Sequence, residues 1–178
     1  MNEFRYLNEG EIEVRVAQCT NNGASLLLYK DARVDARILD ETVGPENWQC
    51  KFYVLKDTLF CSVGIASSHG GAEWTWKDDC GTPSNMESEK GEASDAFKRA
   101  CFKWGIGREL YTAPLIWVPA DKLNLKQGRS GKIACYDRFK VERVKVEEGR
   151  IVGLAIRNES TGKRVFMLAP PTREEVSE

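Results

Sequence analysis

Apolar and polar side chains alternate over residues 12–17, which is the pattern of a half-buried strand. The turn Asn21-Asn-Gly23 follows, so we expect the chain to return as a second strand over residues 24–29. Residues 31–43 then change to helical spacing, and Asp31 is suited to be the N-cap of that helix. This part of the chain therefore predicts two strands followed by a helix.

Three further strands are predicted at residues 47–55, 59–65 and 73–77, where aromatic and β-branched residues are frequent. The connections between them are too short for parallel crossovers, so we expect an antiparallel meander. A polar loop over residues 78–85 leads to a long helix over residues 89–111, which we expect to pack on the meander.

This long helix is predicted to be amphipathic and to end at a glycine. Its apolar stripe consists of Ala93, Ala96, Phe97, Ala100, Cys101 and Trp104. At about 100° per residue, Lys98 and Arg99 project away from the stripe with Phe102 between them. Lys103 lies at one edge of the stripe. Cations around an exposed ring are typical of surfaces that bind single-stranded nucleic acid, although the same charge order also complements the dipole of any soluble helix.

A β-rich extension is predicted over residues 119–170. Its three short strands are expected at residues 136–146, 150–157 and 164–168. We therefore predict an α+β fold, an antiparallel β-meander packed on a long amphipathic helix in the order β-β-α-β-β-β-α, followed by this extension. The core is assigned to residues 1–118, and residues 171–178 are expected to form a disordered tail.

The chain has 178 residues and a net charge of −1, unlike the basic composition of many dedicated DNA-binding domains. Any surface for nucleic acid must therefore concentrate positive charge locally. No apolar run approaches the roughly 20 residues of a transmembrane helix, and the N-terminal residues lack the apolar core of a signal peptide. We therefore expect a cytoplasmic protein.

Catalytic signatures are absent from the sequence. Gly105-Ile-Gly107 is too short for a dinucleotide fingerprint, no P-loop is present, and the six cysteines form no CxxC pair. We therefore expect a protein that is not an enzyme and uses no cofactor. The alternative is a small metal-dependent nuclease of DNA metabolism that uses Glu73, Asp78 and Asp79. An interaction scaffold with no nucleic-acid role is a third interpretation.

Further basic residues lie where the second strand meets the first helix, at Lys30 and Arg33, and they are candidates for phosphate contacts. Five short motifs occur in a characteristic order between residues 29 and 111. These are Tyr29-Lys-Asp-Ala-Arg-Val34, Val43-Gly-Pro-Glu-Asn-Trp48, Glu92-Ala-Ser-Asp-Ala-Phe-Lys-Arg-Ala100, Gly105-Ile-Gly107 and Leu110-Tyr111. With the order of predicted elements, they resemble the Rad-fifty-two-type single-strand annealing proteins of eukaryotes and bacteriophages, over roughly residues 10–115.

The resemblance implies a ring-shaped or helical homo-oligomer that holds single-stranded DNA in a positive groove. Such a protein anneals complementary strands in homologous recombination and repair without ATP or a catalytic metal. The family's basic groove residues fall on Arg33, Lys98 and Arg99, and Lys90 matches a further basic position. Phe102 stands where eukaryotic members tend to carry another basic residue.

The chain stops near residue 178, so the long partner-binding tail of eukaryotic members is not expected. This favours a compact phage or prophage version that works in the cytoplasm of a bacterial host cell. A phage exonuclease or a host single-strand binding protein is then an expected partner, and no membrane is involved.

Overall fold

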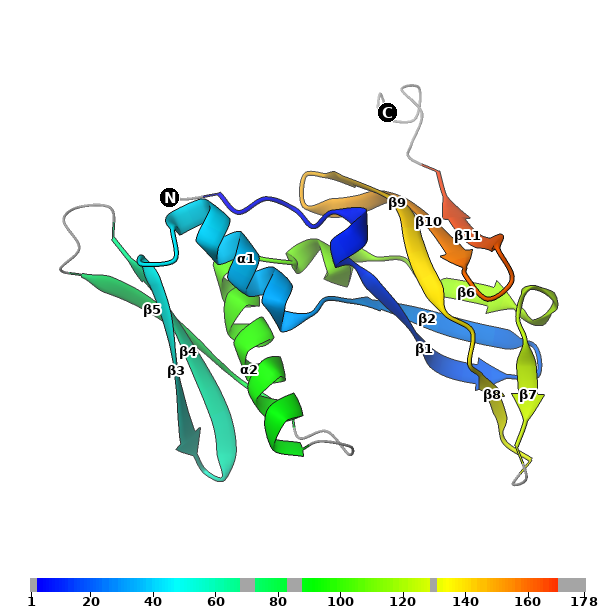
Figure 1. Cartoon of the computed structure of the whole chain (residues 1–178), viewed down its shortest axis with the longest axis horizontal. Helices are drawn as coiled ribbons and strands as arrows, with labels where there is room; N and C mark the ends of the chain where they lie inside the picture. Colours follow the sequence, from blue (N-terminus) through cyan, green and yellow to red (C-terminus); the bar gives the residue numbers. More distant parts are fainter. Residues whose placement is uncertain (1–2, 68–72, 83–87, 129–130, 170–178) are drawn as a thin grey trace. The chain divides into compact units, whose positions relative to one another are not determined.

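The structure is a computed structural model that describes residues 3–67, 73–82, 88–128 and 131–169, although the side chains of residues 88–90 are not part of that description. Its contacts divide the chain into two compact units (Figure 1). The first unit consists of residues 1–5 and 31–108, and the second of residues 6–30 and 109–178. Each unit is built around its own sheet.

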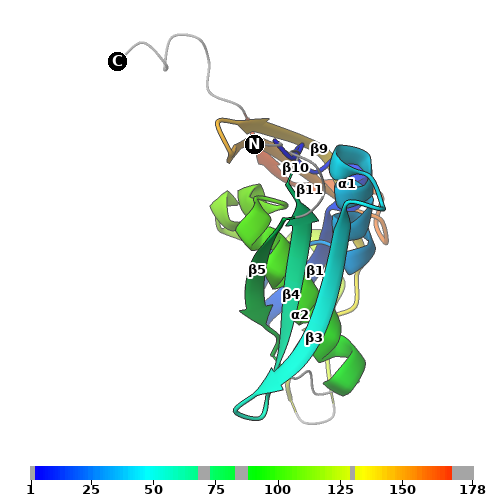
Figure 2. The same cartoon turned by 90° about the vertical axis from the view of Figure 1, so that its left-hand side faces the viewer.

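The first unit is a three-stranded antiparallel sheet with a long helix packed on it. Its elements are α1 (Ala32–Val43), β3 (Trp48–Leu55), β4 (Thr58–Ala66), β5 (Trp74–Cys80) and α2 (Ser88–Trp104). The strands lie in the order β3-β4-β5, and α2 contacts β4 and β5. In Figure 2 the three strands lie in front of α2, so this helix covers only their far face.

The alternation along β4 decides which face of this sheet forms the core. Cys61, Val63 and Ile65 are buried on the face that meets α2. The helix adds four buried side chains to the same core, Ala96, Phe97, Ala100 and Cys101. In addition, the indole N–H of Trp104 donates a hydrogen bond to the Val63 carbonyl (3.0 Å).

The helix ends follow local signals in the sequence. The Asp31 carboxylate accepts a hydrogen bond from the Arg33 amide (2.7 Å), which confirms Asp31 as the N-cap of α1. The second helix ends at Trp104, and Gly105 follows with a φ of 113°, a conformation that favours glycine. The predicted stop at a glycine is therefore confirmed at Gly105, and residues 105–111 of the predicted stretch lie beyond α2.

The second unit contains a six-stranded antiparallel sheet in the order β11-β10-β9-β1-β2-β6. Its strands are β1 (Glu13–Thr20), β2 (Gly23–Tyr29), β6 (Ile116–Pro119), β9 (Phe139–Glu147), β10 (Arg150–Asn158) and β11 (Lys163–Leu168). A separate pair joins β7 (Leu125–Gln127) to β8 (Ile133–Cys135). Short 3-10 helices occur at Glu9–Glu11, Arg108–Thr112 and Ala120–Lys122.

The first hairpin shares its sheet with the C-terminal strands and not with the meander. β1 pairs with β9 at Glu13↔Lys140 and Val14↔Phe139, and β2 pairs with β6. The contacts thus divide the chain differently from the predicted core of residues 1–118 and extension of residues 119–170. Alternation identifies a strand and its buried face, but it does not specify the neighbouring strand when that neighbour is distant in sequence.

The predicted α+β class with mostly antiparallel strands is confirmed. The predicted loop at residues 78–85 was placed too early, because β5 continues to Cys80. The predicted tail at residues 171–178 lies outside the described residues. Within the described ranges, no helix has the length and apolar character needed to cross a membrane.

Candidate nucleic-acid interface

Four basic residues of the first unit form what we call the cationic cluster: Arg33, Lys98, Arg99 and Lys103. The last three lie on α2, whose opposite side is buried against the sheet. The side chains of Arg99 and Lys103 are each 45% exposed, and that of Arg33 is 87% exposed. Burial of the apolar side of α2 thus leaves its cations accessible, as helical spacing predicts.

Asp31 pairs with Arg33, the first cation of the cluster, and is also influenced by the charge of Lys98. The Arg33 guanidinium donates from Nη2 to Asp31 Oδ2 (2.9 Å) and from Nε to Oδ1 (2.9 Å). These bonds, with smaller contributions from the Arg33 and Lys98 charges, lower the pKa of Asp31 to about 2. The charge of Lys98 thus acts on the same carboxylate as that of Arg33, although the two residues come from different helices.

Asp79 on β5 holds the other two cations. Its carboxylate lies 3.4 Å from Arg99 Nε and 3.5 Å from Lys103 Nζ. Burial alone would raise the pKa of Asp79, but the Cys80 amide and the charges of Arg99 and Lys103 lower it overall. Lys103 also donates to the Asp78 carbonyl oxygen. The meander therefore fixes the direction of the basic face of α2.

Two further cations cap the C-terminus of α2. Arg108 donates to the carbonyls of Phe102 (2.8 Å) and Lys103 (2.7 Å), and Lys77 donates to the Lys103 carbonyl (3.0 Å). These bonds satisfy carbonyls that the helix itself leaves unpaired. The Arg108 guanidinium also lies 5.5 Å from the centre of the Phe102 ring, so this half-buried ring packs against a cation.

The sequence alone does not predict these roles of Lys77, Arg108, Asp31 and Asp79. Arg108 carries a usable signal, because basic residues are favoured just beyond a helix C-terminus. Asp31 was predicted as a cap but not as a partner of Lys98. The roles of Lys77 and Asp79 depend on the packing of β5 against α2, which no local pattern predicts.

Two other predicted site residues are not counted in the cluster. Lys30 belongs to the second unit, is only 7% exposed and has interactions of its own. Lys90 lies in the first turn of α2, and its side chain is outside the described part of the structure.

The carboxylates of the nuclease alternative do not form a common site. Asp78 and Asp79 are consecutive residues of β5, so they point to opposite faces of the sheet. The Asp78 carboxylate accepts hydrogen bonds from the hydroxyls of Ser62 and Tyr53, whereas Asp79 pairs with α2. Among the described residues, no group of three His, Cys, Asp or Glu side chains is arranged to hold a metal ion.

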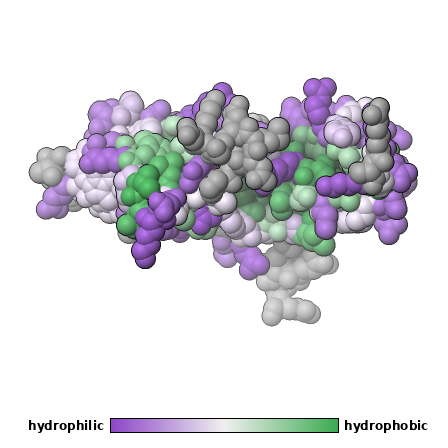
Figure 3. All heavy atoms as spheres, turned by 90° about the horizontal axis from the view of Figure 1, so that it is seen from below, coloured by the Kyte–Doolittle hydropathy of each residue, from purple (hydrophilic) through white to green (hydrophobic). Residues whose placement is uncertain are grey.

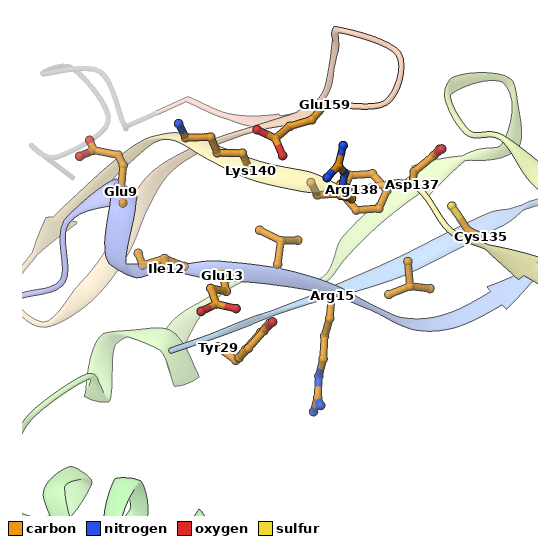
Figure 4. A pocket seen from close by; sticks show the side chains of 14 residues that line it. Glu9, Ile12, Glu13, Arg15, Tyr29, Cys135, Asp137, Arg138, Lys140 and Glu159 are labelled. Atoms are coloured by element: carbon orange, nitrogen blue, oxygen red, sulfur yellow. The ribbon is translucent and has the colours of Figure 1, made fainter. Parts of the chain in front are cut away.

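A hollow of about 550 Å³ lies in the second unit between β1 and the start of β9 (Figure 4). Glu9, Glu13 and Glu159 line it together with the cations Arg138 and Lys140. Because carboxylates line this hollow beside its cations, its electrostatics do not favour a polyanion.

One comparison with known proteins identifies the family. The model for the Rad52/22 family of double-strand break repair proteins matches residues 32–128, which is more than half of the chain. The chain therefore belongs to the Rad52/22 family, and its role lies in DNA repair and recombination. The match includes both helices and the whole meander, and with them the cationic cluster. No curated protein and no solved structure matched the chain.

Proposed function

We propose that the protein binds single-stranded DNA through the cationic cluster and anneals complementary strands without ATP, as a ring-shaped or helical oligomer. Arg33, Lys98, Arg99 and Lys103 contact phosphates. Lys90 adds a further cation, and Phe102 offers a ring for stacking. Lys30 is not included, because its side chain is buried.

The observation that carries this proposal is the set of four cations in the first unit, three of them on α2, in a protomer whose net charge is −1. Single-stranded nucleic acid is bound by positive grooves that follow its backbone, with aromatic rings nearby for the bases. Annealing requires little of the protein beyond binding the strands, because base pairing itself supplies the driving force. Cations that screen the repulsion between two phosphate backbones remove the main electrostatic obstacle.

The edge strand β3 supports the proposed oligomer. Its side chains Phe52, Tyr53, Val54 and Leu55 are between 40% and 68% exposed, and β3 lies at one edge of its sheet. Figure 3 shows hydrophobic side chains gathered over this part of the meander, beside hydrophilic ones. A long apolar edge strand is a template for pairing with another chain, and an array of protomers multiplies weak contacts to one DNA strand.

The test is the double variant Lys98→Ala/Arg99→Ala, assayed for binding to a fluorescent oligonucleotide and for the pairing rate of complementary strands. Magnesium is chelated and no ATP is added. We expect a large loss in both assays. The slope of log Kd against log salt should fall by about 1.4, since each phosphate contact on a single strand contributes about 0.7.

The matched control is Lys163→Ala/Arg164→Ala on β11. It replaces the same two residue types, a lysine followed by an arginine, with alanine. Arg164 pairs with Glu142 as Arg99 pairs with Asp79. This control should bind and anneal as the wild type does. Normal binding by the folded Lys98→Ala/Arg99→Ala protein would refute the assignment of the site.

A further inference from the structure

The β3-β4-β5 sheet has a second face, which points away from α2 and which we call the outer face. Alternation and register place five large side chains on it: Lys51, Tyr53, Phe60, Trp74 and Trp76. They alternate along the strands with the residues that face α2. In Figure 2 no helix lies on the near side of these three strands.

The aromatic rings of the outer face are held in fixed positions. The Tyr53 and Phe60 rings are stacked, with centroids 5.4 Å apart and an angle of 16° between their planes. The Trp74 and Trp76 centroids lie 6.0 Å apart. A Cβ atom at Gly64 would come within 2.7 Å of the Trp76 ring, so the missing side chain at Gly64 lets this ring lie against the backbone of the central strand. Rings that are already positioned lose little entropy when a ligand stacks on them.

A lysine side chain, that of Lys51, covers the Trp76 ring. The Lys51 ammonium lies 4.3 Å from the centroid of the Trp76 ring, and Lys51 is an exposed residue with a long flexible side chain. When a flat ligand takes its place over the ring, this ammonium remains close enough to pair with an anionic group on that ligand. The Asp78 carboxylate on the same face accepts hydrogen bonds from Ser62 and Tyr53, so it disfavours a row of phosphates there.

An antiparallel sheet with a helix behind it and aromatic rings on its open face is a recurrent way to bind the bases of single-stranded nucleic acid. We propose that the outer face is a base-stacking platform, in which Trp76 and the Tyr53–Phe60 pair stack on bases and Lys51 pairs with a nearby phosphate. This inference rests on the proposed function. It adds a site for bases on the face of the sheet opposite to the one that holds α2 and its cations. A second copy of the chain is the competing occupant, but flat rings beneath an exchangeable cation favour a planar, anionic partner.

The experiment compares two probes of equal length, an oligothymidylate of about 20 nucleotides and an abasic oligomer with the same backbone. The wild type should bind the oligothymidylate roughly tenfold or more tightly, because stacking on one base contributes about 1–3 kcal/mol. Trp76→Leu keeps an apolar side chain but removes one ring of the platform, so the ratio of its two Kd values should fall several-fold below the wild-type ratio. Lys51→Ala should weaken binding of both probes by a few-fold, whereas Lys56→Ala removes a cation from the turn of the same hairpin and should have no effect.

The outcomes separate this inference from the proposed function. Equal binding of both probes by the wild type would overturn the platform and leave the cationic cluster intact. Failure of the wild type to bind either probe would overturn both. If Trp76→Leu changes the sedimentation of the protein but not the ratio of the two Kd values, the outer face is a contact between copies and the inference is wrong.

Discussion

The Arg99 guanidinium lies 3.4 Å from the Asp79 carboxylate, so a cation assigned to DNA phosphate is already paired within the first unit. Lys103 lies 3.5 Å from the same carboxylate. DNA must therefore compete with Asp79 for two of the four cations in the cluster. This competition lowers affinity, but it also holds both side chains in place before DNA arrives.

Asp79→Asn should increase the affinity for single-stranded DNA. The change removes one negative charge beside two cations, while the amide oxygen still accepts the hydrogen bond from the Cys80 amide (2.8 Å). Because exposed ion pairs contribute about 0–1 kcal/mol, we expect a gain of up to ~5-fold at low salt that shrinks as salt rises. Fluorescence anisotropy at several salt concentrations measures it. Unchanged or weaker binding at low salt would contradict the role of Asp79.

The positions of Lys98 and Arg99 could be predicted from the sequence, because helical geometry alone separates them from the apolar stripe. Their pairing partners could not be predicted. Asp79 on β5 forms an ion pair with Arg99 on α2, and the charge of Lys98 on α2 lowers the pKa of Asp31 at the start of α1. Both interactions depend on how separate elements pack. The same limit explains the first hairpin: its alternation predicts two strands, but only long-range pairing joins them to the C-terminal strands.

Asp31→Ala should destabilise the first unit. It removes the N-cap of α1, which accepts the Arg33 amide hydrogen bond, and loss of such a cap costs about 1 kcal/mol. Urea unfolding at neutral pH, followed by circular dichroism, measures the difference. Asp31→Asn is the control for the cap alone, since asparagine caps helices about as well as aspartate but does not carry the charge that pairs with Arg33. An Ala variant as stable as the wild type would show that this cap is dispensable.

The same cap makes stability depend on pH at low pH. The Arg33 hydrogen bonds lower the folded-state pKa of Asp31 from 3.8 to about 2. The folded state thus favours the ionised carboxylate, and the stabilisation is complete above about pH 4 and is lost as the pH falls through about 2. The stability difference between wild type and Asp31→Asn should therefore change between these two pH values and stay constant above them. A constant difference down to pH 2 would contradict the lowered pKa.

Cys50 should react with alkylating agents at a lower pH than an ordinary cysteine. It is exposed on β3, and the register places it diagonally across from the buried Cys61 on β4. A hydrogen bond from the Cys61 thiol lowers the pKa of Cys50 from 9.0 to about 7, while that bond and burial raise the pKa of Cys61. Because the thiolate is the nucleophile, its reaction with iodoacetamide should reach half its maximal rate near pH 7.

Mass spectrometry of the modified peptides separates Cys50 from the other cysteines. Cys61→Ala removes the donor, so the pH of half-maximal reaction at Cys50 should move up toward 9.0, the value for an ordinary cysteine. If this variant reacts with the same pH profile as the wild type, the Cys61 thiol does not lower the pKa of Cys50.

Val54→Lys should break up the proposed oligomer without unfolding the protomer. Val54 is 68% exposed on the edge strand β3, so its replacement removes little packing within the chain and should change the free energy of unfolding by less than about 0.5 kcal/mol. A lysine on an edge strand opposes pairing with another strand, because its charge would lose water in the contact. Sedimentation velocity should therefore show smaller species for the variant than for the wild type.

Met167→Lys provides the matched control for this variant. Met167 is 65% exposed and lies on β11, the edge strand of the other sheet, so the substitution adds the same charge at a similar position. The control should sediment as the wild type does. If assembly depends on β3, Val54→Lys should also slow strand annealing while each protomer keeps its cationic cluster, because single protomers lose the multiplied contacts of an array. Wild-type assembly by Val54→Lys would show that β3 is not the contact between copies, and a loss of assembly in Met167→Lys instead would place that contact on β11.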